Sequence, residues 1–195
     1  MNILVEKLPT AIEIDSREYE VNTDFRSCLR IILAFEDPEL ASIEKQTVLI
    51  ENLYKEKPDN IQKAFEQGVK FLNGGVANED KDEVGYRLYS FEKDANIIFA
   101  AFRQTHGIDI NTASLHWFKF LALFMDLGSE TLFCNVTGIR KRVADGTATK
   151  EEKKMVREMP DIFDLPQPDT RTLDEREAEN KFMELIEQGK ERGKS

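Results

Sequence analysis

The stretch from Asn111 to Leu127 reads NTASLHWFKFLALFMDL, contains the only tryptophan, and limits the possible folds more than any other part of the chain. On a helix of 3.6 residues per turn its polar side chains fall on one narrow stripe, and apolar side chains cover nearly everything else. A helix that is apolar almost all round must be buried. We expect Asn111 or Thr112 to cap its start and Gly128, in a left-handed conformation, to end it. The stretch therefore predicts a central core helix with amphipathic segments packed around it.

The remaining apolar residues also recur at helical spacing, and capping or breaking residues bound most of these periodic segments. The helices expected on this basis start at Thr23 or Asp24 (to about Glu36), at Asp37-Pro38, at Pro58 (to Asn73), at Ser90 (to His106), near Leu132 (to Val143), and at a T-x-x-E capping box formed by Thr149 and Glu152. Gly74-Gly75 and Gly107 are expected to end two of them. Only six prolines occur in the 195 residues, which agrees with a mainly α fold.

Each expected helix has one apolar face that we predict to be buried. These faces consist of Phe25, Leu29, Ile32 and Leu33; Leu40, Ile43, Ile50 and Leu53; Ile61, Phe65, Val69 and Leu72; and Leu132, Val136, Ile139 and Val143. Residues Ala11 to Val21 instead alternate apolar and polar around Asp15-Ser16, the pattern of a small β-hairpin. An isolated hairpin is marginally stable, so it should lie against the helices.

The C-terminal part differs in composition from the rest. PDIFDLPQP, from Pro160 to Pro168, has three prolines and no helical period, so it is expected to be an extended connector. An amphipathic helix should follow at about Leu173 to Gly189, with Ala178, Phe182, Leu185 and Ile186 on its apolar face. This helix either folds back on the body or docks in a partner's groove. We therefore predict a helical core domain at residues 1–145 and a linked C-terminal part at residues 146–195.

Charge and cysteine content restrict the environment and the partners. The formal net charge of −10 argues against nucleic-acid binding, because phosphate contacts need a basic surface. Cys28 and Cys134 each lie in an apolar helical context and are expected to be free thiols in a reducing compartment. No window of the sequence approaches the ~20 consecutive apolar residues of a membrane span. The apolar run at the N-terminus is too short for a signal peptide. We expect a cytoplasmic protein without membrane contact.

The sequence contains few residues that could form a chemical site. His106 and His116 lie on different expected helices without further ligands at metal-site spacing, so capping or solvated roles are favoured over a metal site. No nucleophile motif or phosphate-binding loop is recognisable, and we expect neither enzymatic activity nor a cofactor. The cluster Arg140-Lys141-Arg142 is interpreted as complementing a helix dipole rather than as a nucleic-acid patch.

Two apolar surfaces are candidates for binding a partner. On the core helix, Trp117 and Phe120 could line a partner groove, although core packing is the favoured interpretation. On the C-terminal helix, Phe182, Leu185 and Ile186 could dock on another protein.

Several stretches together resemble a family of bacteriophage tail assembly chaperones from long, non-contractile-tailed phages of Gram-positive bacteria. They are LPTAIEIDSREYEVNTDFR (8–26), YSFEKDANIIFAAF (89–102), GIDI (107–110), LHWFKFLALF (115–124) and IRK (139–141). The block LHWFKF after GIDI is the most specific. The family pattern usually has a second tryptophan where this chain has Phe118, which is a conservative departure. Residues after about Ala144 match only loosely.

The resemblance implies a non-enzymatic protein that binds the phage tape measure protein and keeps it soluble until the tail tube polymerises. Contact with the major tail protein and self-association through the C-terminal helix are further expectations. Such a protein would act in the host cytoplasm and be absent from the mature particle. Two alternatives remain open at this point: a minor tail component retained in the virion, and a helical module that binds a host protein.

Overall fold

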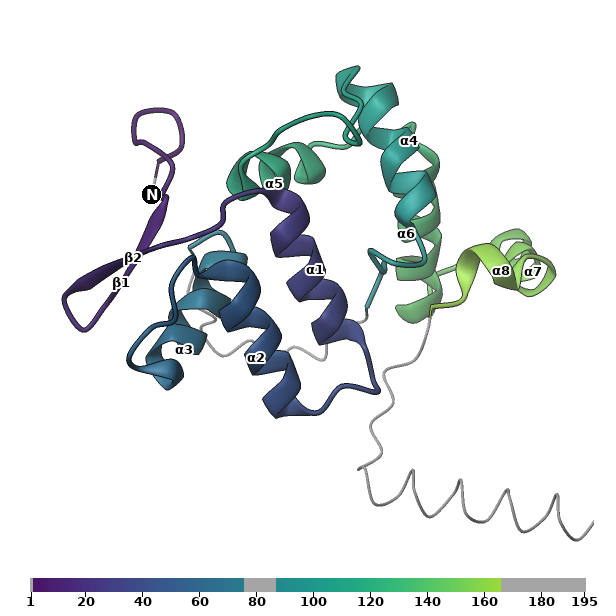
Figure 1. Cartoon of the computed structure of the whole chain (residues 1–195). Coiled ribbons are helices and arrows are strands. Elements are labelled where there is room, and N and C mark those ends of the chain that lie inside the picture. Colours follow the sequence, from purple (N-terminus) through teal and green to yellow (C-terminus); the bar gives the residue numbers. More distant parts are fainter. Residues whose placement is uncertain (1, 76–86, 166–195) are drawn as a thin grey trace, which may run out of the picture.

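The structure is a computed structural model that describes residues 2–75 and 87–165 (Figure 1). This part is mainly helical with a two-stranded antiparallel hairpin, which confirms the expected fold class. Its elements are β1 (Ala11–Ile14), β2 (Arg17–Glu20), α1 (Phe25–Glu36), α2 (Ser42–Leu53), α3 (Ile61–Leu72), α4 (Ala95–His106), α5 (Trp117–Met125), α6 (Leu132–Ala144), α7 (Lys150–Glu158) and α8 (Pro160–Phe163). The C-terminal helix expected at about Leu173 to Gly189 lies outside the described residues.

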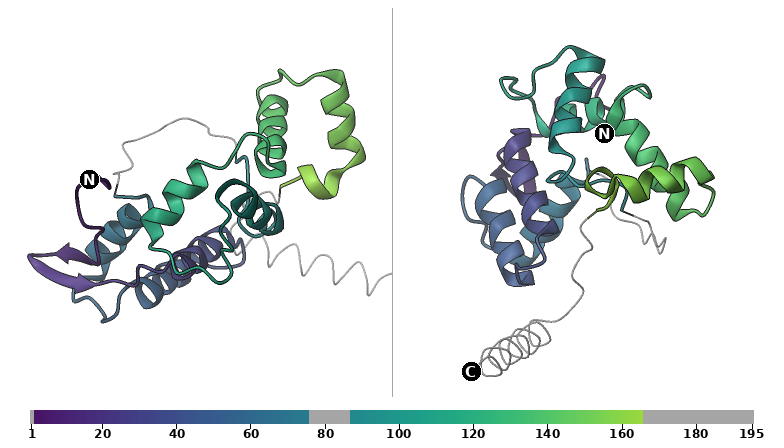
Figure 2. Two further views of the ribbon diagram at one scale, coloured as in Figure 1. Left: turned by 90° about the horizontal axis from the view of Figure 1, so that it is seen from above. Right: turned by 90° about the vertical axis from the view of Figure 1, so that its right-hand side faces the viewer.

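The helices form two groups joined through α1 and α5 (Figures 1 and 2). One group consists of α1, α2 and α3, with the hairpin packed on α3 through β1. The other consists of α4 and α6, and α6 also contacts α7 and α8. The hairpin and the α7–α8 pair lie at opposite ends of the molecule (Figures 1 and 2). Since residues 166–195 are not described, the division into residues 1–145 and 146–195 stays a prediction.

The core is built on stacked aromatic rings. The ring of Phe120 on α5 lies 4.9 Å from Phe25, 5.2 Å from Phe102 and 5.5 Å from Trp117, with near-parallel planes. Trp117 is fully buried, and its indole Nε1 donates to the Leu72 carbonyl oxygen at 2.9 Å. Because the indole N–H is satisfied, the ring is buried without an unpaired donor. The prediction of a central core helix is confirmed, although α5 is not buried all round, since Met125 is 83% exposed.

That core helix is shorter than expected at its N-terminal end. It begins at Trp117, and its cap is His116, whose Nδ1 accepts from the Phe118 amide at 3.1 Å. The Trp117 amide donates to the Thr23 carbonyl at 2.7 Å, and residues 111–116 are not helical. The expected caps Asn111 and Thr112 are therefore wrong, because a backbone contact to a distant segment replaces the first helical turns.

The end of α5 also differs from the expectation. The helix stops at the cap residue Asp126, and Gly128 has no left-handed backbone. The Gly128 amide instead donates to Thr105 Oγ1 at 3.0 Å. Gly107, in contrast, is left-handed with φ 67° and ends α4 as expected.

Three helix starts were expected too early. α2 begins at Ser42 rather than at Asp37-Pro38, where the Asp37 side chain accepts from Glu39 in a separate turn. α3 begins after Asn60, whose side chain accepts from the Lys63 amide at 3.1 Å. α4 begins at Ala95, although Ser90 Oγ accepts from the Lys93 amide in the preceding turn. Proline permits a helix start but does not require one, and in α3 the start follows the cap residue Asn60 instead.

Other caps lie where the sequence placed them. Asp24 caps α1 through its contact with the Arg26 amide at 2.9 Å. Thr149 and Glu152 form the expected capping box of α7, with reciprocal contacts of 3.1 and 2.9 Å. The expected extended connector after α7 is wrong in its first part, since Pro160–Phe163 form the short helix α8 and Phe163 is buried.

The buried faces of several helices are rotated from those expected. In α1 the buried residues include Cys28 and Ile31, whereas Leu33 is 37% exposed. In α6 the inward residues are Phe133, Val136 and Arg140, whereas Leu132 is 54% exposed and Val143 is 37% exposed. Arg140 accounts for the wrong prediction in α6. Hydrophobic periodicity assigns a charged residue to the solvent side, so it cannot show that Arg140 is buried with its partners.

Arg140 is held in the interior by five hydrogen bonds. Its Nη1 and Nη2 donate to the two carboxylate oxygens of Asp94 at 2.6 and 3.0 Å. Its three remaining contacts are to the carbonyl oxygens of Leu88, Ile162 and Phe163, at 2.6 to 3.0 Å. The prediction that the cluster Arg140-Lys141-Arg142 complements the helix dipole is therefore wrong for Arg140, whereas Lys141 and Arg142 lie in the last turn of α6. Arg140 instead joins α6 to the start of α4 and to α8.

Two helical glycines should respond in opposite directions to alanine. A Cβ at Gly68 would lie 2.6 Å from Leu49 Cδ2 and 3.1 Å from Leu53 Cδ2, both fully buried. We expect Gly68→Ala to lower the free energy of unfolding by about 1 kcal/mol, because overpacking of ~1–3 kcal/mol exceeds the gain in helix propensity. Gly138→Ala should raise it by about 0.5–1 kcal/mol, since its Cβ meets only the exposed Arg142 guanidinium at 3.4 Å. Urea denaturation of both variants measures this, and a stabilised Gly68→Ala would show that Leu49 adjusts freely.

Candidate functional site

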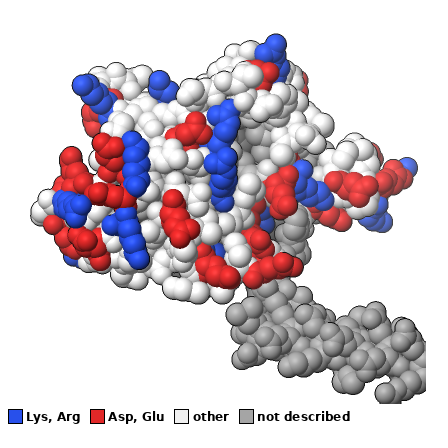
Figure 3. All heavy atoms as spheres, viewed as in Figure 1, with Lys and Arg blue, Asp and Glu red and all other residues white. Residues whose placement is uncertain are grey.

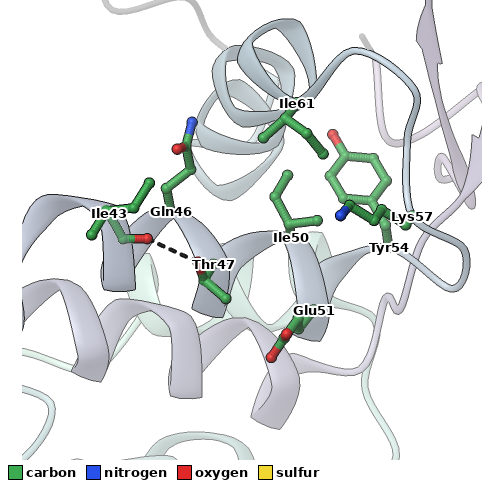
Figure 4. A pocket seen from close by; sticks show the side chains of 8 residues that line it. All are labelled: Ile43, Gln46, Thr47, Ile50, Glu51, Tyr54, Lys57 and Ile61. Carbon is green, nitrogen blue, oxygen red and sulfur yellow. Dashed lines mark hydrogen bonds between the residues drawn. The ribbon is translucent and has the colours of Figure 1, made fainter.

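A groove beside α2 and the start of α3 is the best-formed candidate binding site (Figure 4). It has a volume of about 440 Å³ and opens to solvent. Its apolar residues are Ile43 and Ile50 from α2 and Ile61 from α3. The side chains of Ile50 and Ile61 point toward one another (Figure 4). The other lining residues are Gln46, Thr47, Glu51, Tyr54 and Lys57.

Ile43 is the residue that makes this groove unusual. It lies in the first turn of α2 and is 67% exposed, although the sequence pattern predicted it to be buried. α2 buries Ile50 and Leu53 as expected, and also Leu49, but no element covers its first turn, which contains Ile43. An isoleucine exposed beside further apolar residues is a feature of binding surfaces more than of a solvated helix face.

Two polar groups in the groove wall, the hydroxyls of Tyr54 and Thr47, are bonded within the chain. The Tyr54 hydroxyl donates to the Ala64 carbonyl at 2.7 Å, and burial raises the pKa of this phenol well above its usual range. The Thr47 hydroxyl donates to the Ile43 carbonyl at 2.9 Å (Figure 4). Tyr54 therefore contributes its ring rather than a titrating group. The groove is suited to apolar side chains, with Glu51 and Lys57 as charged groups at its rim.

The two histidines have structural roles and lie apart from the groove. His116 caps α5 through Nδ1, so its Nε2 carries the proton and donates to the Pro9 carbonyl at 2.9 Å. His106 Nε2 contacts the Leu123 carbonyl at 2.9 Å. In residues 2–75 and 87–165, no group of three or more His, Cys, Asp or Glu side chains is arranged to hold a metal ion.

The cysteines are free, as expected, and Cys28 is fully buried. Burial raises the pKa of the Cys28 thiol to about 12. Because the thiolate is the reactive form, Cys28 is unsuited to nucleophilic chemistry. The helices of the described part include none that is long and apolar enough to cross a membrane.

The sequence-based candidates for partner binding do not line the groove. Trp117 and Phe120 are 0% and 1% exposed, so a partner could reach them only if the core opened. Phe182, Leu185 and Ile186 lie outside the described residues. The sequence pattern did not mark Ile43 as a binding residue. The available signal was Glu44, whose carboxylate accepts from the Ala41 amide at 2.8 Å and marks the true start of α2.

Charged side chains are spread over the surface of the molecule (Figure 3). On the face seen in Figure 3, acidic and basic groups are interspersed. The surface between them includes uncharged areas, so contacts with another protein could combine apolar and ionic groups.

Comparison with known proteins gives a family for most of the chain. A family model described as bacteriophage Gp15 protein matches residues 4–165, which include every described helix and strand. No curated protein matches the chain, and no solved structure does. The matched region contains all of the segments that carry the resemblance noted from the sequence. The chain belongs to the bacteriophage Gp15 protein family.

Proposed function

We propose that this phage protein is a tail assembly chaperone that binds the tape measure protein and keeps it soluble until the tail tube polymerises around it. The observation that carries the proposal is the open apolar groove at Ile43, Ile50 and Ile61. Membership of a bacteriophage family and the resemblance of five sequence stretches to tail assembly chaperones supply the biological context. The protein acts without catalysis, in the host cytoplasm, and leaves before the particle is complete.

The groove would bind an amphipathic helix of the client. Apolar side chains spaced one helical turn apart would lie on Ile43, Ile50 and Ile61, and polar residues of the client would face Glu51 and Lys57. A groove of this size holds only a few side chains, so each contact is weak. Many copies along one long client would provide avidity and still permit displacement by the growing tube.

Co-expression with the tape measure protein of the same phage tests the proposal. The wild-type chain should increase the soluble fraction of the client and co-purify with it. Ile43→Glu should reduce the amount of complex about tenfold, because a charge replaces an apolar contact with the client. The substitution should not disturb the core, since Ile43 is exposed. Met125→Glu is the matched control, since Met125 is 83% exposed on α5 and outside the groove.

The outcomes separate the possible roles. Full activity of Ile43→Glu would show that the groove is not the client-binding site, but it would leave the chaperone function standing. Failure of the wild-type chain to solubilise or bind the client would overturn the function itself. Detection of the chain by mass spectrometry in purified virions would favour a retained structural component instead.

A further inference from the structure

A stripe of basic residues runs along α7. Lys150, Lys153, Lys154 and Arg157 recur at the spacing of one helix face and line a single shallow depression together with Glu158. α7 buries none of its residues. Within the described part of the chain, the only ion pair of this basic stripe joins Lys154 to Glu158 at 3.7 Å, with both side chains more than 60% exposed. The basic stripe thus faces solvent in a chain whose formal net charge is −10.

The hairpin presents the opposite charge. The register of β1 and β2 places Glu13 directly opposite Glu18 on the exposed face of the hairpin. Glu20 on the same face pairs with Lys55 at 2.8 Å, whereas no ion pair of Glu13 or Glu18 occurs among the described residues. Like charges directly opposite one another destabilise a strand pair. A basic surface from another molecule would relieve this repulsion.

One copy cannot bring these two surfaces together. The hairpin and α7 lie at opposite ends of the molecule (Figure 1 and the left view of Figure 2). We propose that the acidic hairpin face of one copy, Glu13 and Glu18, docks on the basic stripe of α7 in the next copy. The contact is heterologous, so successive copies form a ring or an open row rather than a two-fold dimer.

The contact is weak and suited to assembly on a template. Its charges are exposed and screened by salt, so isolated copies associate only at high concentration and low ionic strength. Copies held side by side on one elongated partner associate more readily, because their effective concentration is high. The inference does not depend on what that partner is.

Charge reversal provides a stringent test in the full-length protein. The acid-reversal variant is Glu13→Lys/Glu18→Lys, which keeps two like charges opposite one another and so preserves the local strand repulsion. The base-reversal variant is Lys153→Glu/Lys154→Glu. Each variant alone should lose at least ~tenfold in association constant by sedimentation velocity at low salt, because equal charges then meet at the contact.

The equimolar mixture of the two variants should associate like the wild type. In the mixture, the basic hairpin of one variant meets the acidic α7 of the other, and the unchanged hairpin and α7 also match. The quadruple variant should associate too, with the net charge of −10 retained. Lys70→Glu/Lys119→Glu changes the net charge as the base-reversal variant does, but away from α7, and should retain association.

Carbodiimide cross-linking of mixed isotope-labelled and unlabelled wild-type chains identifies the contact directly. We expect cross-links between copies that join Lys153 or Lys154 to Glu13 or Glu18. A wild-type chain that stays monomeric at all concentrations, or a mixture that fails to associate, would overturn the inference. So would cross-links from α7 only to carboxylates of residues 166–195.

Discussion

Replacing Arg140 by methionine should destabilise the protein by about 3–5 kcal/mol, the largest single-residue effect that we expect at a polar site. The substitution removes the bidentate partner of Asp94, which is 3% exposed, and leaves this carboxylate buried without its counter-charge. The carbonyl oxygens of Leu88, Ile162 and Phe163 also lose their donor. Urea denaturation followed by circular dichroism measures the change in free energy of unfolding.

A neighbouring arginine on the same helix is the control. Arg142 pairs with Glu152 at 2.5 Å, but its side chain is 46% exposed, so Arg142→Met should destabilise the protein far less than Arg140→Met. Arg140→Met/Asp94→Asn should be more stable than Arg140→Met, because the unpaired buried charge is then removed. Equal effects of Arg140→Met and Arg142→Met would contradict the buried position of Arg140.

Truncation of Phe120 to alanine should also cost about 3–5 kcal/mol, because its ring is 1% exposed and stacks on Phe25, Phe102 and Trp117. The cavity would open beside the only tryptophan of the chain. We therefore expect a red shift of the Trp117 emission in addition to the lower unfolding midpoint. Both quantities can be read in one fluorescence-monitored denaturation.

Phe99 on α4 provides the matched comparison. Its ring is 39% exposed, so Phe99→Ala removes the same atoms from a partly solvated position. We expect a loss of about 1 kcal/mol or less and an unchanged emission maximum. If Phe99→Ala and Phe120→Ala were equally destabilising, the stacked aromatic cluster would not be the centre of the core.

The two surfaces proposed for binding share no residue, although the hairpin packs on α3 beside the groove. The groove at Ile43 lies on α2 and α3, whereas the self-association contact uses the hairpin and α7. Client binding and association between copies would therefore use different residues. Variants of Ile43 and of the basic stripe should then impair different steps, client binding and association between copies respectively.

The groove illustrates where sequence reasoning reached its limit. The apolar period correctly indicated a helix that contains Ile43, Ile50 and Leu53. It could not show that Ile43 stays exposed, because an apolar residue in a first turn fits the period whether or not another element covers it. Only the position of α3, in close contact with α2 at Gly68, decides which side chains are covered.

By itself, the sequence determined the helical class, the hairpin and the caps at Asp24, Thr149 and Gly107, because residues a few positions apart encode hydrophobic period and capping chemistry. The tertiary structure alone decided where α5 begins and which face of α6 is buried. The Trp117 amide is satisfied by Thr23 rather than by a preceding helical turn, and Arg140 is buried because Asp94 lies opposite it. Both outcomes depend on partners distant in the chain, and the local pattern around each residue contains no information about them.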